Sequence, residues 1–137
     1  MDVHYRFDLS GVDWPAMKAT LAEDRFDNGR TPEQLRISFE NSFAACIAEA
    51  GGRCVGTARV LSDGVCNAYL VDVWTYTPYR GRGVARSMIQ ALLKRLPGQH
   101  LYTFTDDVVD FYRKLGFKER PTGLEIVVGK WLENDTR

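Results

Sequence analysis

A glycine-rich, doubly basic run in the middle of the chain, Arg-Gly-Arg-Gly-Val-Ala at residues 80–85, has the residue types of an anion-binding loop. It stands between an expected strand that ends at Tyr76 and an expected helix over residues 83–96. The first amides of a helix have no partner within the helix, and the helix dipole adds partial positive charge there. Glycines would let a phosphate approach those amides closely. Taken alone, the loop fits a surface turn with two arginines equally well.

A second segment, residues 105–117, places two aromatic side chains late in an expected helix and a glycine where that helix stops. Phe111 and Phe117 are typical of core residues, and Gly116 of a left-handed helix cap. Tyr112 differs from them, because a phenol combines an apolar ring with a proton donor whose pKa is about 10. Tyr112 is therefore the candidate proton donor of this segment.

The elements that must position these two segments predict a single α+β domain over residues 1–137. Alternating patterns, caps and turn residues place strands and helices in one order without repeats. A residue within 10–13 could cap the first helix, and Thr31-Pro32-Glu33-Gln34 is typical of a capping box at the start of the second. Helices are expected from a cap within residues 10–13 to residue 23 and over residues 31–40, 83–96 and 106–116. Strands are expected over residues 3–9, 42–49, 53–61, 66–76, 100–104 and 117–128, the last of them broken at residues 121–123. Residues 130–137 are expected as a tail. Three consecutive strands form an antiparallel meander, and a β-α-β crossover then gives a mixed sheet.

The three cysteines are interpreted as buried, reduced packing residues, with a reactive thiol as the alternative. A two-residue turn at Gly51-Gly52 would pair Cys54 with Glu49 and Cys46 with Thr57, which keeps these two thiols apart. An odd number of cysteines argues against a disulfide framework, and their spacing fits no zinc pattern.

Composition narrows the range of functions. The chain has 137 residues, enough for one core, and a formal net charge of zero, so no broad basic field favours nucleic acid. No apolar run approaches the roughly 20 residues that span a bilayer, and the first residues lack the pattern of a signal peptide. We therefore expect a cytoplasmic protein without a nucleic-acid, membrane or metal partner.

Together the two segments resemble the GNAT superfamily of acetyl-CoA-dependent N-acetyltransferases. The loop matches the family pattern Gln/Arg-x-x-Gly-x-Gly/Ala at Arg80, Gly83 and Ala85. The second segment matches aromatic-Tyr-x-x-x-Gly-Phe from Phe111 to Phe117. The resemblance implies a mixed, mostly antiparallel sheet flanked by helices, with a splayed central strand pair. It also implies transfer of an acetyl group from acetyl-CoA to a small-molecule or peptide amine, and it is compatible with a homodimer.

The resemblance also assigns residues to the cofactor. The strand before the loop would offer backbone groups to pantetheine, and main-chain amides of the loop would hold the pyrophosphate, with the arginine side chains auxiliary. The candidate cofactor-binding residues are Val73, Trp74, Thr75, Arg80, Gly81, Arg82, Gly83, Val84, Ala85, Arg86, Thr105 and Phe111. Thr105 replaces an asparagine that is usual in the family, and Val108 replaces a common alanine.

Catalysis in such a protein would be direct attack of the amine on the thioester. Tyr112 occupies the position whose hydroxyl protonates the departing thiolate in many members. A base or a water relay must keep the amine neutral. Asp72 is the first candidate base, with an exposed or backbone-bonded aspartate as the alternative. Asp106 and Asp107 compete for this role, and each equally suits a helix cap.

The acceptor site in such folds is built from the first helices and the late connections, here residues 23–30 and 121–124. The first stretch holds three carboxylates against two arginines, which suits a cationic amine or simply a solvated loop. Two other classes of function compete: a non-catalytic CoA-binding domain and a phosphotransferase. The phosphotransferase is disfavoured, because this chain lacks the Gly-Lys-Ser/Thr that follows the glycine-rich loop of such nucleotide-binding proteins.

Overall fold

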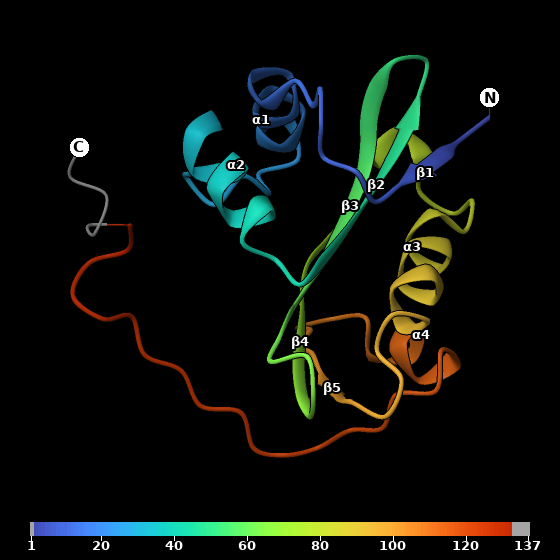
Figure 1. Ribbon diagram of the computed structural model, residues 1–137, viewed down its shortest axis with the longest axis vertical. Helices are drawn as coiled ribbons and strands as arrows, with labels where there is room; N and C mark the ends of the chain where they lie inside the picture. The colour runs from blue at the N-terminus through green and yellow to red at the C-terminus, as the bar shows by residue number, and fades with distance from the viewer. Residues whose placement is uncertain (1, 133–137) are drawn as a thin grey trace. The chain divides into compact units, whose positions relative to one another are not determined.

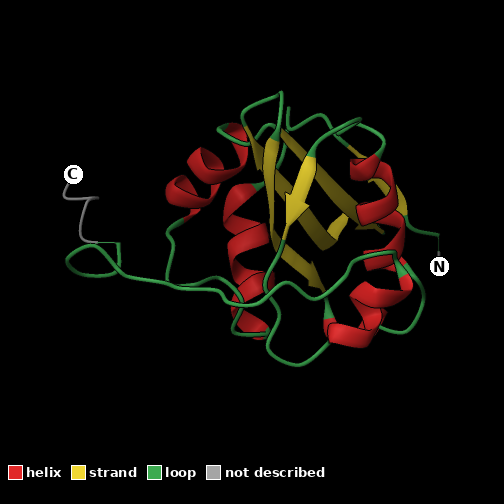
Figure 2. Cartoon of the chain, turned by 90° about the horizontal axis from the view of Figure 1, so that it is seen from below, coloured by secondary structure: helices red, strands yellow, loops and turns green. Residues whose placement is uncertain are grey.

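The chain folds around a five-stranded sheet that carries helices on both of its faces (Figures 1 and 2). The structure, a computed structural model, describes residues 2–132. It divides into two compact units, Met1–Thr103 and Phe104–Arg137, which are described one at a time. The whole sheet lies in the first unit, and the second contains one short helix. The predicted single domain over residues 1–137 stays a prediction.

The sheet confirms the predicted mixed topology. Its strands lie in the order β1-β2-β3-β4-β5, antiparallel except for the parallel pair β4 and β5. A helix between β4 and β5 makes the expected crossover. The strands are β1 (His4–Arg6), β2 (Ala44–Ala50), β3 (Arg53–Ser62), β4 (Asn67–Thr75) and β5 (His100–Tyr102).

Helices α1 (Trp14–Glu23) and α2 (Pro32–Glu40) cover one face of the sheet, and α3 (Val84–Leu93) covers the other (Figure 1). The predicted start signals are confirmed. Asp13 accepts a hydrogen bond from the Ala16 amide at the start of α1, and Thr31 forms a capping box with Gln34 at the start of α2. A short 3-10 helix, η1 (Thr77–Tyr79), links β4 to the loop that precedes α3.

Gly56 on β3 lets α3 pack unusually close to the sheet. A Cβ built at this glycine would lie 3.1 Å from Met88 Cε, 3.1 Å from Val84 Cγ1 and 3.2 Å from Ala48 Cβ. Any larger residue would therefore push α3 away from β2 and β3. This contact fixes the height of α3, and of the loop before it, above the sheet.

Two bulges change the predicted strand register. The Gly51-Gly52 turn pairs Glu49 with Cys54 as expected, but β3 then carries Val55 as an extra residue. Beyond this bulge Cys46 faces Ala58, not the predicted Thr57, because one added residue shifts every later pair. The second bulge lies in β4, where Asp72 and Val73 together oppose the single residue Ala58.

The parallel strands β4 and β5 separate soon after they begin. Only Asn67, Ala68 and Tyr69 of β4 pair with β5, although β4 continues to Thr75. Thr103 Oγ1 donates to the Leu70 carbonyl just beyond the last pair, at 3.0 Å. The later backbone of β4 is thus left without a neighbouring strand on this side, which agrees with the predicted splayed pair.

Burial separates the three cysteines, and for one of them the prediction was wrong. Cys46 is buried, Cys54 is partly buried, and Cys66 is exposed, all as free thiols. Cys66 lies in the turn between β3 and β4, where the Asp63 carboxylate accepts hydrogen bonds from the amides of residues 65, 66 and 67. The turn holds Cys66 outside the sheet, whereas the sequence pattern extended β4 to include it.

The second unit differs from the sequence prediction in two ways. Its helix α4 (Val109–Lys114) is capped at neither Asp106 nor Asp107; the Thr105 hydroxyl instead accepts from the Val108 amide at 3.1 Å. The strand predicted over residues 117–128 is wrong, because the described residues there form no strand. The Gly116 cap is confirmed by its φ of +103°. Residues 133–137 of the expected tail lie outside the described residues.

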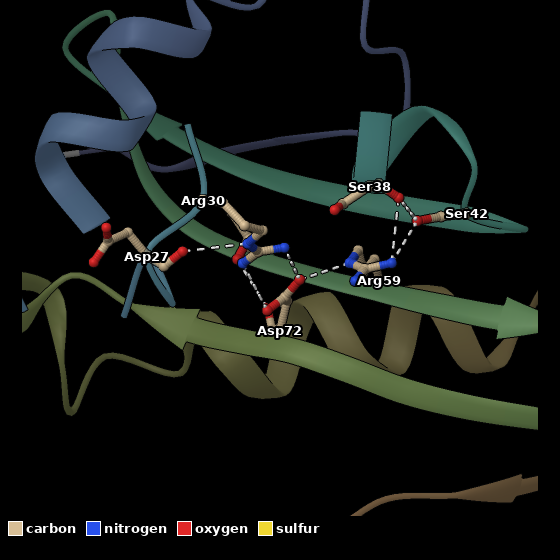
Figure 3. A network of polar contacts seen from close by, with 7 residues as sticks. Asp27, Arg30, Ser38, Ser42, Arg59 and Asp72 are labelled. Carbon is tan, nitrogen blue, oxygen red and sulfur yellow. Dashed lines mark hydrogen bonds and ion pairs between the residues drawn. The ribbon is translucent and has the colours of Figure 1, made fainter. Parts of the chain in front are cut away.

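The carboxylate of Asp72 is the centre of a buried ionic network (Figure 3). It accepts hydrogen bonds from Arg30 Nη1 at 3.0 Å, Arg30 Nη2 at 3.1 Å and Arg59 Nε at 2.6 Å. Burial alone would raise the pKa of this carboxyl. The hydrogen bonds and charges of Arg30, and then those of Arg59, outweigh burial and hold the pKa below its usual value. The network joins β4 to β3 and to the α1–α2 loop, residues 24–31.

The thiols give a direct check of the burial pattern. Burial raises the pKa of Cys46 to about 11 and that of Cys54 to about 12, so few thiolates form there at about pH 8. We expect a disulfide reagent to modify Cys66 rapidly in the folded protein, and the other two only after denaturation. Cys66→Ser is the matched control and should remove the fast phase. A fast phase that persists in this variant would contradict the assignment.

The ionic network predicts a pH-dependent stability. Asp72→Asn should lower the free energy of unfolding by about 3 kcal/mol at neutral pH, because two buried guanidiniums lose their counter-charge. The folded-state pKa of Asp72 lies below the unfolded value, so its stabilisation is present above about pH 4 and is lost as the pH falls through the folded-state pKa.

Urea unfolding at a series of pH values measures this effect. The difference between wild type and D72N should narrow below about pH 4. The exposed Asp2→Asn is the control and should show no such difference at any pH. A D72N difference that stays constant as the solution is acidified would contradict the network.

Candidate active site

The loop between η1 and α3 has the geometry of an anion cradle. Gly81 and Gly83 both have a φ of +78°, and a Cβ built at either would meet nothing within 4 Å. Gly83 is the N-cap of α3, and no side chain caps this helix end within the described residues. The first amides of α3 are therefore left for a ligand, at the end of the helix where the dipole is positive. This arrangement suits a phosphate or pyrophosphate group.

The arginines of the loop differ in what they contact. Arg80 folds back on the protein: its Nε donates to the Thr75 carbonyl at 3.0 Å, and its Nη2 lies 3.8 Å from the Asp24 carboxylate. The Arg82 guanidinium lies over the Tyr79 ring, with Cζ 5.1 Å from the ring centroid. Arg86 is exposed on the first turn of α3. Arg80 thus fastens the loop to the end of β4.

The strand that leads to the loop presents backbone where β4 and β5 have separated. Val73 and Thr75 are half-buried, whereas Trp74 is 2% exposed and packs in the core beneath α1 and α2. Trp74 can therefore serve a ligand through its main chain only. The amides and carbonyls of this stretch can accept an extended, amide-containing ligand.

Asp24, at the C-terminal end of α1, ties the core to the start of η1. Its carboxylate accepts from Trp74 Nε1 at 2.9 Å, from the Thr77 amide at 3.0 Å and from Thr77 Oγ1 at 2.7 Å. Burial alone would raise the pKa of Asp24, but the hydrogen bonds from Thr77 and Trp74 outweigh it and lower the pKa. Asp24 therefore stays ionised and holds the peptide segment just before the cradle.

The carboxylates of the α1–α2 region are engaged with the protein itself. Glu23 accepts from the Tyr76 hydroxyl at 2.8 Å and from Arg53 at 2.8 Å, and Asp27 pairs with Lys18. The sequence suggested either an acidic rim or a solvated loop. The structure shows instead a loop whose acidic side chains fasten it to the neighbouring elements.

Asp72 lies on β4 directly before the candidate pantetheine-binding residues Val73 to Thr75, as predicted. Its surroundings, however, are those of an ion-pair partner. All three hydrogen bonds that its carboxylate accepts from the described residues come from guanidiniums, and its pKa is lowered. A carboxylate with a lowered pKa is a weak proton acceptor. The general-base role of Asp72 stays a prediction, and this environment counts against it.

The remaining predicted site residues belong to the second unit. Tyr112 on α4 is buried, and its ring makes edge-to-face contacts with two phenylalanines. The distance between ring centroids is 5.0 Å to Phe111 and 5.3 Å to Phe117. These contacts hold the direction of the phenol within the unit. The Thr105 hydroxyl accepts a hydrogen bond from the amide of Val108, the residue just before α4, so it has a partner within the protein.

Sequence reasoning missed three residues that organise the first unit: Arg30, Arg59 and Asp24. Arg30 and Asp72 are 42 residues apart, and no local pattern links them. The one available signal was the excess of turn residues around Arg30, in Asp27-Asn28-Gly29, which marks a tight loop.

The described residues contain neither a group of metal ligands nor a helix that could cross a membrane. Among residues 2–132, no three His, Cys, Asp or Glu side chains come together in a group that could hold a metal ion. In the same part of the chain, no helix is long and apolar enough to cross a membrane.

Comparison with known proteins finds relatives that are named as N-acetyltransferases. An uncharacterized N-acetyltransferase, ycf52, from Pyropia yezoensis is 36% identical over 104 residues, 70% of this chain and 60% of the relative. Serotonin N-acetyltransferase 2, chloroplastic, from Oryza sativa is 31% identical over 123 residues, 84% of this chain and 61% of the relative. The chain spans about half to three fifths of the length of the first curated relatives that it matches.

A solved structure and a family model extend the match. A crystal structure described as a putative GNAT-family acetyltransferase from Xanthomonas campestris is 26% identical, with a TM-score of 0.80, and covers 96% of this chain and 98% of its own. The model of the acetyltransferase (GNAT) family matches residues 10–117, which include both the loop and the Tyr112 segment. On this match, the chain belongs to the acetyltransferase (GNAT) family.

Proposed function

We propose that this protein transfers an acetyl group from acetyl-CoA to a primary amine. The observation that carries the proposal is the uncapped N-terminus of α3, preceded by two open glycines of positive φ. It supports pyrophosphate binding at the end of a strand that, among the described residues, has no neighbouring strand on one side beyond Tyr69. One ligand that combines a pyrophosphate with an extended amide-containing arm is CoA.

The chemistry would proceed by direct attack. The amine nitrogen bonds to the thioester carbonyl carbon, the carbon–sulfur bond breaks, and Tyr112 gives its phenolic proton to the departing thiolate. The amine loses one proton in the same sequence. Because Asp72 is bound by two guanidiniums, we propose that water carries this proton away, as a relay in place of a carboxylate base.

The names of two relatives suggest which classes of acceptor amine to test. One relative is named for serotonin, and a soybean relative, 35% identical over 77 residues, is named a histone acetyltransferase. An arylalkylamine and a lysine-containing peptide therefore join polyamines and aminoglycosides in a test panel. Some relatives are chloroplastic by name, so a cytoplasmic location stays a prediction, as does a homodimer.

The panel tests the proposal itself. Each amine is mixed with protein and acetyl-CoA, and release of the free thiol is followed with a chromogenic disulfide. We expect release with at least one amine above the rate without an acceptor. Binding of acetyl-CoA in calorimetry without release for any amine would instead favour the non-catalytic CoA-binding domain.

The cradle predicts that Gly83→Asp abolishes acetyl-CoA binding. The new carboxylate would fill the space beside the first amides of α3 and repel phosphate, and we expect affinity to fall at least about a hundredfold. Gly98→Asp is a matched control, because Gly98 has the same φ of +78° and the same open surroundings. Calorimetry should give wild-type affinity for G98D. Retained affinity in G83D would remove the cradle from the proposal.

The acid role predicts that Tyr112→Phe lowers kcat by about a hundredfold or more while the Kd for acetyl-CoA stays unchanged. The substitution keeps the ring and its contacts with Phe111 and Phe117 and removes only the hydroxyl. Tyr5→Phe on β1, at the far edge of the sheet, is the control. Unchanged turnover of Y112F in a chemistry-limited assay would assign the proton to another donor.

A further inference from the structure

Asp72 has a backbone conformation that needs support from its surroundings. Its φ is +55°, in the left-handed region, and it lies in the β4 bulge where two residues oppose Ala58. Non-glycine residues adopt this region at a cost, and they persist there when neighbouring structure holds them. The bulge sets the direction in which β4 continues along β3, with which Trp74 and Thr75 still pair, beyond its last pair with β5.

The support comes from the α1–α2 loop. Arg30 makes two parallel hydrogen bonds to Asp72, and both side chains are almost fully buried, at 7% and 5% exposed. A bidentate guanidinium fixes both the position and the rotation of a carboxylate. The rest of Arg30 is held by its own loop, since Nε donates to the Asp27 carbonyl at 3.2 Å (Figure 3).

Arg59 completes the support from the opposite side. Its Nε donates to Asp72, while its Nη1 donates to the Ser38 carbonyl at 3.2 Å and lies 3.4 Å from Ser42 Oγ. Asp72 is therefore bound from one side by Arg30 of the α1–α2 loop and from the other by Arg59, which also contacts the end of α2 (Figure 3). Its backbone cannot leave the left-handed region without breaking these bonds.

The residues that follow Asp72 are those whose backbone would receive the pantetheine arm. Val73 to Thr75 lie beyond the last β4–β5 pair, at Tyr69. The pyrophosphate cradle is held separately, by Asp24 through Thr77 and by the Arg80 bond to the Thr75 carbonyl. The bulge is thus held by Arg30 and Arg59, and the cradle by Asp24 and Arg80, although Asp24 and Arg30 both belong to the α1–α2 loop.

We propose that Arg30 is a positioning residue that acts through Asp72 to set affinity for the pantetheine arm of acetyl-CoA, and not for its pyrophosphate. The inference rests on the proposed function in one respect, that the ligand is acetyl-CoA. It gives the α1–α2 loop a role in cofactor binding, although no residue of the loop need touch the cofactor.

The test compares two ligands by calorimetry: acetyl-CoA, and 3′-phosphoadenosine 5′-diphosphate, which has the pyrophosphate but no pantetheine. Arg30→Met should weaken acetyl-CoA binding roughly tenfold or more and leave binding of the nucleotide within about twofold. Asp72→Asn should do the same. The double variant should be no weaker than either single variant, because the two residues act as one unit.

Two controls keep the result interpretable. Arg36→Met removes a guanidinium that pairs with Glu33 and Glu40 along α2, and should change neither affinity. If Arg30→Met fails to fold, Arg30→Lys retains the charge but lacks the bidentate fork, and it should show the same selective loss.

The outcomes separate the inference from the proposed function. Wild-type affinity for acetyl-CoA in the Arg30 variants, or an equal loss for both ligands, would overturn the inference alone. A wild-type protein that binds neither ligand would overturn the inference and the proposed function together.

Discussion

The structure of the first unit depends on one constraint: the buried Asp72 carboxylate must have its charge balanced. Taking a carboxylate out of water is costly, and only close, well-directed cationic donors offset that cost. Arg30 and Arg59 provide them, and each comes from a different part of the chain. Satisfying one charge therefore brings together the α1–α2 loop, β3 and the bulge of β4. The α1–α2 loop and the bulge of β4 are thus held by the same ion pairs.

Much of the fold could be predicted because its signals are local. The capping box at Thr31, the Gly51-Gly52 turn and the Gly116 cap each depend on a few adjacent residues, and each is confirmed. The bulges were not predictable, because an extra residue in a strand leaves the apolar pattern nearly unchanged. The Cys46 register was wrong for this reason. The strand expected over residues 117–128 failed because an alternating pattern states a tendency, whereas a strand also needs a partner.

The candidate site divides in the same way. The cradle at Gly81 and Gly83 could be predicted, because both conformational freedom and position before a helix are visible in the sequence. The anchors Asp24 and Arg30 could not, since their partners Trp74, Thr77 and Asp72 lie more than forty residues along the chain. Asp72 shows the difference most clearly. Its position in the chain suggested a base, and its partners indicate a fixed counter-ion.

The close packing at Gly56 divides the site into parts with different freedom to evolve. Because α3 lies within 3.1 Å of the position a Cβ would take, almost any change at Gly56, Val84 or Met88 would shift the helix and the amides at its start. In the α1–α2 loop, by contrast, Arg25 is exposed, whereas Gly29 is exposed but has a φ of +78° that favours glycine. In the proposed acetyltransferase, such exposed side chains of the loop could change with the acceptor amine while the donor side stays constant, provided that Asp24 and Arg30 are kept.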